Sequence, residues 1–502
     1  MYWLKRKLRK INWSLIANLN GYVLICLGLL MVLPTICSLI YKEDVVYDFL
    51  ITIAICLVVG FGLSKIKRSR RDFFARDGMI AVGLCWITAS LFGGLPYFIS
   101  QEIPSYVDCF FEAVSGFTTT GSSIVPDVSA LSKGILFWRS FTHWIGGMGI
   151  LVFIQAFIPK ANERSMHIIR AESPGPIIGK LVPRIQQTAA ILYSMYMGLT
   201  ILCIVFLLVG GMPLFDTLCY TFGTAGTGGF SISSLSVGEY NNLYYEIVIT
   251  VFMLLFGINF NLYYFLLLKK FKSVFKSEEL RTYLFIVFAS MILIALNISK
   301  MYGGFFEGLR YSSFQVATII STTGYATTDF NLWPMFSKSI LLCLMVVGAC
   351  AGSTAGGIKV SRFLIILKKI KLDIQRLIHP QKVSAITMDG KIVDEVTVQQ
   401  ILTFFGCFIL ILLSCILLVS LDNLDFETTI SSVFTCIGNV GPAFGLAGPM
   451  GNFAMYSDLS KIVLSVAMLV GRLEIYPILI FLFPLFKIPD LFNPKKFYKH
   501  SN

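Results

Sequence analysis

The chain has 502 residues and a formal net charge of +13; 56% of its residues are hydrophobic and only 14% are charged. Soluble domains carry about 25% charged residues, so this composition excludes a water-soluble globular protein and indicates a chain surrounded by membrane lipid. The positive charge does not indicate a nucleic-acid partner, because the basic residues lie in short segments between apolar stretches, where they orient membrane helices.

Apolar stretches long enough to cross a bilayer as helices recur along the whole chain. We predict ten spanning helices, at residues 16–41, 46–66, 77–100, 134–158, 185–209, 242–268, 281–298, 337–372, 397–420 and 459–486. The first stretch is too long for a signal-peptide core and has no clear cleavage site, so we expect it to be retained. The eighth stretch is too long and glycine-rich to form one straight helix.

The basic residues alternate with these helices. Of the 41 Lys and Arg residues, 33 lie in six segments, at 1–11, 64–76, 159–184, 269–281, 359–391 and 487–499. The positive-inside rule places all six in the cytoplasm, and ten helices satisfy that placement. We therefore expect both termini to be cytoplasmic.

Four connections on the opposite side share a pattern, in which a half-helix of about a dozen residues, too short to span, precedes a glycine-terminated turn. They read DCFFEAVSGFTTTGSS (108–123), DTLCYTFGTAGTGGFS (216–231), SSFQVATIISTTGYAT (312–327) and ETTISSVFTCIGNVGPAF (427–444). Aligning their last glycines gives four tetrads: Thr118-Thr119-Thr120-Gly121, Gly226-Thr227-Gly228-Gly229, Ser321-Thr322-Thr323-Gly324 and Gly438-Asn439-Val440-Gly441.

This repetition predicts an all-α polytopic membrane protein with four pseudo-symmetric repeats of helix, half-helix, loop and helix around one central pore. We expect an N-terminal helix pair at residues 1–70 and repeats at 71–170, 171–275, 276–385 and 386–502, the third of which carries an intramembrane gating loop. Ordinary surface turns are the alternative, but four such turns at equivalent positions argue against it.

The tetrads suit the chemistry of a bare cation. Such an ion needs a ring of oxygens in place of its hydration shell, and backbone carbonyls supply one without the tight binding of a carboxylate ring. Glycine permits the backbone angles that turn successive carbonyls inward, and the negative ends of the half-helices favour a cation there.

Residues 348–357, GACAGSTAGG, form a run of small residues inside the eighth predicted span. We interpret them as a break in the helix whose loop blocks the pore until it moves; the gate would comprise Gly348, Gly352, Ser353, Thr354, Gly356 and Gly357, together with Arg472. The alternative is a close helix-packing face, because Gly348, Gly352 and Gly356 recur every four residues.

Arg472 lies deep in the last span, where a charge is costly and usually functional. We expect it to face the pore and repel cations; a structural salt bridge, for example with Glu474, is the alternative. Arg139, His143 and Trp144 of the fourth span are expected to pack rather than to handle ions.

Six stretches together resemble the Trk/Ktr/HKT superfamily of potassium transporters, in its TrkH/TrkG branch. They are SGFTTTGSSIV (115–125), RSFTHWIGGMGILVF (139–153), GTGGFS (226–231), STTGYATTDF (321–330), GACAGSTAGGIKVSR (348–362) and NVGPAFG (439–445). The resemblance implies K⁺ as the transported ion, held at Thr118, Thr119, Gly226, Thr227, Ser321, Thr322, Gly438 and Asn439, and no organic cofactor in this chain.

The resemblance also implies a homodimer in the inner membrane of a bacterium and a cytosolic, nucleotide-binding regulatory subunit of the TrkA type. The basic stretch Lys359–Arg376 would dock that subunit, bind anionic lipid, or serve only as a cytosolic anchor.

We therefore expect gated K⁺ uptake driven by the membrane potential, with coupling to H⁺ left open. A Na⁺-permeable or non-selective transporter of the same superfamily is the alternative, because the tetrads depart from TVGYG and share only their last glycine. A multispanning enzyme is a distant alternative, since no HExxH, GxSxG or Walker motif occurs. A carrier of organic solutes would show matched halves rather than a fourfold repeat.

Overall fold

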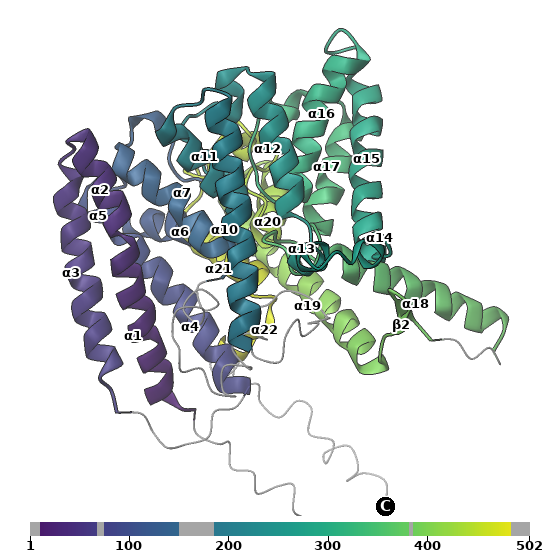
Figure 1. The fold of residues 1–502 in the computed structure, drawn as a ribbon, viewed down its shortest axis with the longest axis horizontal. Helices are drawn as coiled ribbons and strands as arrows, with labels where there is room; N and C mark the ends of the chain where they lie inside the picture. The colour runs from purple at the N-terminus through teal and green to yellow at the C-terminus, as the bar shows by residue number, and fades with distance from the viewer. Residues whose placement is uncertain (1–10, 68–74, 150–184, 381–384, 483–502) are drawn as a thin grey trace, which may run out of the picture.

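The computed structural model describes residues 11–67, 75–149, 185–380 and 385–482, and its helices pack side by side into one body (Figure 1). The longer helices and their extensions are α1 (Trp13–Leu30), α2 (Val32–Tyr41), α3 (Val45–Ser64), α4 (Ala75–Gly93), α5 (Leu95–Ile99), α7 (Lys133–Gly147), α10 (Ile185–Val209), α12 (Leu243–Phe256), α13 (Phe260–Leu267), α14 (Phe271–Phe275), α15 (Glu278–Ile298), α17 (Met335–Val347), α18 (Val360–Ile378), α19 (Glu395–Val419), α21 (Asp458–Arg472) and α22 (Tyr476–Leu482).

The remaining elements are shorter. Four half-helices, α6 (Tyr106–Phe117), α11 (Leu214–Gly226), α16 (Phe305–Ile320) and α20 (Phe426–Gly438), precede the four tetrads. Five 3-10 turns are η1 (Val128–Ala130), η2 (Ser236–Tyr240), η3 (Phe330–Leu332), η4 (Ser420–Asp422) and η5 (Gly445–Ala447). Strands β1 (Thr387–Met388) and β2 (Lys391–Ile392) form a small antiparallel hairpin, with Thr387 opposite Ile392.

Within the described residues, six helices are long and apolar enough to cross a membrane, or seven if the bent pair α12 and α13 counts as one span. The six are Trp13–Tyr41, Val45–Ser64, Arg76–Ile99, Ala190–Val209, Glu278–Ile298 and Glu395–Asp422. The prediction of an all-α membrane fold is thereby confirmed, whereas the count of ten spans stays a prediction. The end of the fourth predicted span and the segments 1–10, 159–184 and 487–499 lie outside the described residues.

Two spans predicted as single helices are interrupted, and here the prediction was wrong. The sixth bends by 92° between α12 and α13. Asn259 begins the second helix as its N-cap, accepting a hydrogen bond from the Asn261 amide at 3.0 Å. The tenth is broken between α21 and α22, where Glu474 and Ile475 take positive φ angles of 55° and 69°. The eighth is broken as expected, since residues 348–359 between α17 and α18 are not helical.

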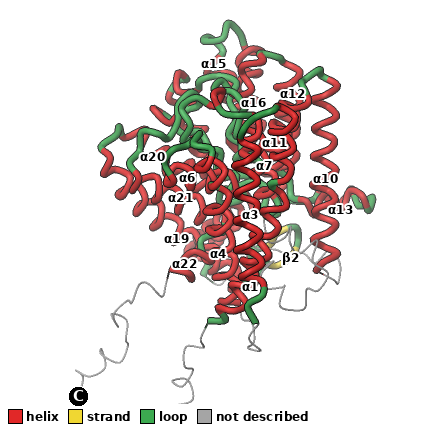
Figure 2. Tube along the Cα trace, turned by 90° about the vertical axis from the view of Figure 1, so that its left-hand side faces the viewer, coloured by secondary structure: helices red, strands yellow, loops and turns green. Residues whose placement is uncertain are grey.

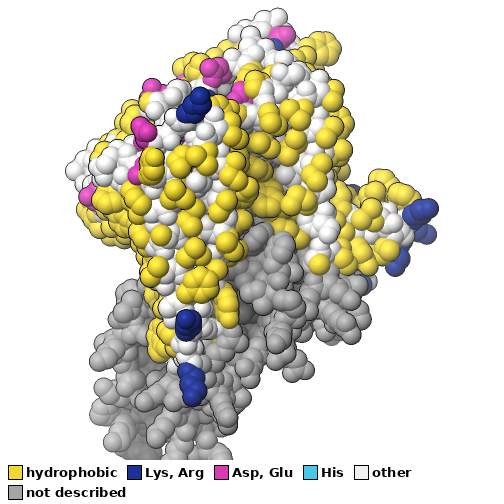
Figure 3. All heavy atoms as spheres, turned by 60° about the vertical axis from the view of Figure 1, so that its left-hand side comes forward, with side chains coloured by type: hydrophobic (Ala, Val, Ile, Leu, Met, Phe, Trp, Pro, Cys, Tyr) yellow, Lys and Arg dark blue, Asp and Glu magenta, His cyan; other side chains and the backbone are white. Residues whose placement is uncertain are grey.

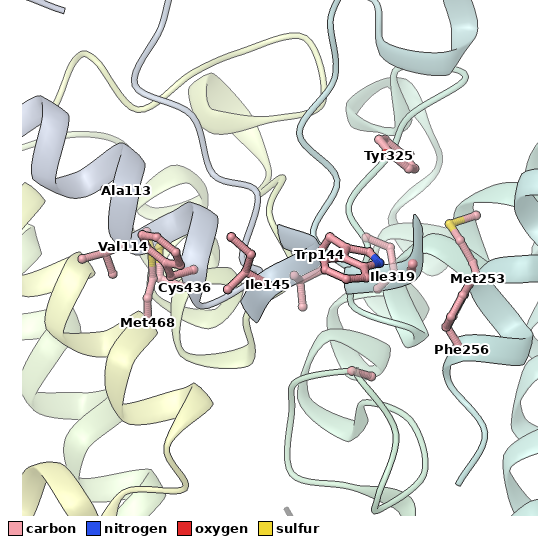
Figure 4. Packing of buried hydrophobic residues seen from close by; sticks show 14 of the residues in the cluster. Ala113, Val114, Trp144, Ile145, Met253, Phe256, Ile319, Tyr325, Cys436 and Met468 are labelled. Atoms are coloured by element: carbon pink, nitrogen blue, oxygen red, sulfur yellow. The ribbon is translucent and has the colours of Figure 1, made fainter. Parts of the chain in front are cut away.

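The half-helices pack inside the body against the longer helices. Helix α6 lies between α7 and α21, α11 against α7, α16 against α15, and α20 against α21. Loops gather among the helices in the upper part of the molecule, near the labelled half-helices α6, α11, α16 and α20 (Figure 2). Val114, Cys436 and Met468, from α6, α20 and α21, belong to one buried apolar cluster that also includes Trp144, Ile145 and Ile319 (Figure 4).

The outer surface has the character of a membrane protein. Large apolar side chains are exposed along the helices, among them Val58, Val209, Phe285 and Leu417, and hydrophobic atoms cover the middle of the face in Figure 3. On this face the acidic side chains lie toward the upper end, while most Lys and Arg lie at the lower end and on the projecting helix at the right. Lipid therefore replaces water around the middle of the molecule.

Candidate ion pathway

The four half-helices begin with acidic residues. Asp108, Asp216, Glu307 and Glu427 each lie in the first turn of their half-helix, where a carboxylate favours the positive helix end. Helix α20 also has Asp425 as its N-cap, and hydrogen bonds from the Thr428 hydroxyl and amide lower the pKa of this carboxyl. Asp108 and Asp216 are also the first residues of the first two stretches predicted as half-helices, and both half-helices include them in their first turn.

The four half-helices also end alike. In each, the amide of the third tetrad residue donates to the carbonyl five residues earlier at 2.8 to 2.9 Å; the pairs are Thr120 to Ser115, Gly228 to Gly223, Thr323 to Thr318 and Val440 to Thr435. The amide of the second tetrad residue donates to the carbonyl three residues earlier in all four. These two bonds form the Schellman arrangement, which ends a helix on a left-handed residue.

The tetrads share one backbone despite their different sequences. The second residues Thr119, Thr227, Thr322 and Asn439 have φ angles of 54°, 56°, 57° and 54°, and the last residues Gly121, Gly229, Gly324 and Gly441 have 81°, 79°, 88° and 109°. A left-handed β-branched residue costs about 1–2 kcal/mol, which the capping bonds offset. This left-handed second position, which the sequence did not indicate, is common to all four repeats.

The four tetrads form a closed ring. A Cβ atom added to Gly121 would lie 1.9 Å from the Gly228 carbonyl oxygen, and one on Gly229 would lie 1.9 Å from that of Thr323. The same construction on Gly324 meets the Val440 oxygen at 2.3 Å, and on Gly441 it meets the Thr120 oxygen at 2.8 Å. Each tetrad thus abuts the next, the fourth abuts the first, and the contacts leave no room for a side chain at these glycines.

A cavity opens on one side of the ring. Its lining includes all four final glycines and the residues that follow them, among them Ser122, Phe230 and Pro442. The structure therefore brings together all the tetrads singled out from the sequence, with a recess leading to their last residues.

A buried ion pair supports the first two tetrads. Arg139 of α7 and Glu112 of α6 are 1% and 0% exposed, with 2.7 Å between Arg139 Nη2 and Glu112 Oε1. Glu112 also accepts from the Ile124 amide at 2.9 Å, and Arg139 donates to the Ser231 carbonyl at 3.3 Å. The pair thus links the chain that follows the first tetrad to the chain that follows the second. Glu112 is not among the site residues predicted from the sequence, although an acid in an apolar segment is a usable signal.

The intramembrane loop, residues 348–359, connects α17 and α18, and its two ends lie close together. Its neck is tight, because a Cβ on Gly348 would lie 2.7 Å from the Gly356 oxygen and 3.1 Å from Gly357 Cα. The Lys359 amide donates to the Val347 carbonyl at 3.1 Å. Gly348, Gly352 and Gly357 have positive φ angles, so the alternative of a continuous helix-packing face is wrong.

This loop touches the tetrads. The Gly356 amide donates to Thr322 Oγ1 at 2.7 Å, and a Cβ on Gly356 would lie 2.5 Å from the Gly438 oxygen. Ser353 and Thr354, which we included in the gate, are buried in the same loop.

Arg472 holds the loop from another side. Its guanidinium donates to the Thr354 carbonyl at 2.6 Å and to the Gly146 and Gly147 carbonyls at 2.6 and 2.8 Å. Glu474, weighed as a salt-bridge partner of Arg472, forms an ion pair with Arg362 of α18. Arg472 therefore bridges the intramembrane loop and the end of α7.

The bend between α12 and α13 fastens the loop to the helices that follow the second tetrad, a contact that the sequence did not reveal. The Cys350 amide donates to the Gly257 carbonyl at 3.1 Å, and the Phe260 amide donates to the Gly352 carbonyl at 3.0 Å. Glu279, in the first turn of α15, accepts from the Ala351 amide at 2.7 Å and the Ser361 amide at 3.2 Å. One carboxylate thus holds both ends of the loop.

Half-helices that converge on a closed ring of backbone carbonyls define a pore-forming membrane protein of the cation-transport class. The family model TrkH, "Cation transport protein", matches residues 46–300 and 307–488. The chain belongs to this TrkH family of membrane cation transport proteins, a family of transporters rather than enzymes.

Individual relatives match over nearly the full length. The chain is 34% identical to the Trk system potassium uptake protein TrkG of Escherichia coli K12, over 93% of this chain and 96% of that protein. It is 32% identical to TrkH of Salmonella typhimurium, over 95% and 99% of the two chains. The crystal structure of the potassium transporter TrkH from Vibrio parahaemolyticus superposes with a TM-score of 0.85 at 31% identity, covering 95% of this chain and 99% of that one.

Proposed function

We propose that this chain takes up K⁺ across the inner (plasma) membrane of a bacterium, and that the ring of four tetrads is its selectivity filter. The closed contact of Gly121, Gly229, Gly324 and Gly441 with their neighbours' carbonyls carries the proposal. The names of the TrkG and TrkH relatives, which are potassium uptake proteins, support the choice of ion.

The chemistry of the ring fits a dehydrated cation. Carbonyls of the tetrads would replace the water shell, with K⁺ at the first two positions of each tetrad. Thr119 Oγ1 and Asn439 Oδ1 are buried and have no hydrogen-bonding partner among the described residues, so these oxygens are available as further ligands. The membrane potential would supply about 2.3 kcal/mol per ion per 100 mV.

Further features belong to the same proposal. The chain divides into an N-terminal helix pair at 1–70 and four repeats, has both termini in the cytoplasm, and assembles as a homodimer. A cytosolic nucleotide-binding subunit of the TrkA type regulates it, since the relatives are named as parts of Trk systems. The intramembrane loop and Arg472 form the gate, and the basic helix α18 faces that subunit and anionic lipid.

The test is complementation of a bacterium that lacks its own K⁺ uptake systems. Co-expression of this chain with a matching nucleotide-binding subunit is expected to restore growth at low K⁺. Flux in proteoliposomes then distinguishes a channel from an H⁺ symporter. A channel follows the K⁺ gradient and the voltage alone, whereas a symporter also responds to an H⁺ gradient. Flux of Na⁺ without preference for K⁺ would overturn the proposal in favour of a non-selective transporter.

Removing the carboxylate of Glu279 is expected to loosen the gate. In Glu279→Ala the Ala351 and Ser361 amides lose their acceptor, and hydrogen bonds to a charged group contribute about 1.5–3 kcal/mol. We therefore expect K⁺ flux in the absence of the regulatory subunit to rise by about tenfold or more. Glu278→Ala is the matched control, because Glu278 contacts Lys368 and the Asp389 amide rather than the loop; equal flux in the two variants would contradict the assignment.

A further inference from the structure

His143 lies on α7 between the first two tetrads and is fully buried. Its Nδ1 is 2.8 Å from the Gly116 carbonyl oxygen, in the last turn of half-helix α6. Its Nε2 accepts a hydrogen bond from the Phe230 amide at 3.0 Å, and Phe230 directly follows Gly229. One imidazole ring therefore bonds the entrance of the first tetrad and the exit of the second.

The two partners define the protonation of the ring. The Gly116 carbonyl has no hydrogen to donate, so Nδ1 must carry the proton, and the Phe230 amide donates, so Nε2 must be free to accept. Only the neutral imidazole protonated at Nδ1 satisfies both. A side chain in this place must thus present one donor and one acceptor side by side.

The His143 imidazole explains why the second tetrad has glycine at its third position, where the other tetrads have larger residues. A Cβ on Gly228 would lie 2.2 Å from His143 Cγ and 2.3 Å from Nδ1, and a Cβ on Gly226 would lie 2.2 Å from the His143 carbonyl oxygen. At the third position the other tetrads carry Thr120, Thr323 and Val440. The imidazole therefore occupies the volume that a side chain would need at Gly228.

Neighbouring contacts make His143 a firm support. The His143 and Phe230 ring centroids are 4.3 Å apart. Arg139, which is on α7 like His143, places its guanidinium carbon 4.3 Å from the centroid of the Phe230 ring. One helical turn further on, a Cβ at Gly147 would lie 2.7 Å from Gly226 Cα. Helix α7 thus contacts the second tetrad at its start, its middle and its exit.

We propose that His143 is a positioning residue for ion selectivity, which sets the relative height of the first and second tetrads through its two hydrogen bonds and its fit against Gly228. This inference rests on the proposed filter and adds a residue that does not itself touch the ion. A displaced tetrad carbonyl changes the size of the oxygen ring, so the property that responds is K⁺/Na⁺ discrimination rather than the amount of folded protein.

The test compares His143→Leu and His143→Gln in K⁺ and Na⁺ flux into proteoliposomes, with membrane abundance and gel-filtration profile measured in parallel. Leu keeps an apolar volume but supplies no polar atom, and a single buried hydrogen bond is worth about fivefold in an equilibrium. We expect the K⁺/Na⁺ flux ratio to fall by about fivefold or more in His143→Leu and to recover in His143→Gln, whose amide carries one donor and one acceptor. His379→Leu, at an exposed position after α18, is the control.

A double-mutant cycle tests the fit between the ring and the glycine. Gly228→Ala is expected to lower the flux ratio sharply, while the same change made in His143→Ala should have little further effect, because the space is then empty. Additive effects, or an unchanged ratio in His143→Leu while Gly324→Ala alters it, would overturn the role of His143 and leave the proposed filter standing. If neither Gly324→Ala nor the His143 variants alters the ratio, the filter proposal fails as well.

Discussion

Gly121→Ala is expected to abolish most of the discrimination between K⁺ and Na⁺. The added methyl carbon would lie 1.9 Å from the Gly228 carbonyl oxygen, so that the neighbouring tetrad must move. Overpacking of this kind costs about 1–3 kcal/mol, and alanine also disfavours the φ angle of 81°. We expect a fall of tenfold or more in the K⁺/Na⁺ flux ratio, about 1.4 kcal/mol per factor of ten, measured in proteoliposomes.

The control is Gly406→Ala on α19, where an added Cβ would meet nothing within 4 Å. This variant should keep both abundance and flux ratio. If Gly121→Ala transports with unchanged selectivity at normal abundance, residues 118–121 do not form part of the filter.

Shortening the intramembrane loop is expected to open the pathway permanently. Gly348 and Gly357 are adjacent at its neck, so deleting residues 349–356 would join them with α17 and α18 left nearly in place. The deletion removes Gly356 from its contact with Thr322 and takes away the Thr354 carbonyl that Arg472 binds. K⁺ flux without the regulatory subunit should rise by about tenfold or more. A pathway whose closed state is favoured by about 1.4 kcal/mol is open for only about a tenth of the time, and the deletion removes the closed state.

Arg472→Gln loosens the intramembrane loop without shortening it and is compared with the deletion. Arg472→Gln keeps a donor for one carbonyl but loses the simultaneous bonds to Thr354, Gly146 and Gly147, so a smaller rise in flux is expected. A deletion variant that is correctly assembled but transports less than the unaltered protein would show that the loop is part of the conducting path rather than its gate.

The positions of the tetrads could be predicted because glycine has a distinctive physical role. Each final glycine combines a positive φ angle with contact to a neighbouring carbonyl, and only a residue without a side chain meets both demands. Spaced between long apolar stretches, four such glycines are visible in a single sequence. The half-helix starts were visible for a similar reason, since carboxylates gather at helix N-termini.

Other parts of the site depend on tertiary contacts that a sequence does not display. The left-handed Thr119, Thr227 and Thr322 run against the local preference of β-branched residues and are held by capping bonds. The bend at Asn259 lies in an apolar stretch of spanning length, where periodicity gives no warning. Glu279 reads as an ordinary first-turn acid of α15 until the Ala351 and Ser361 amides are seen to converge on it.

The intramembrane loop follows the third tetrad in the chain and contacts the bend between α12 and α13, which follows the second tetrad. In an assembly of four identical subunits, each subunit would carry the same loop, and the four copies would compete for one narrow space near the axis. A single polypeptide avoids this conflict, because each of its four half-helices and tetrads has its own sequence. If the loop is the proposed gate, a single loop outside the ring would then close a path that four segments of one chain build together.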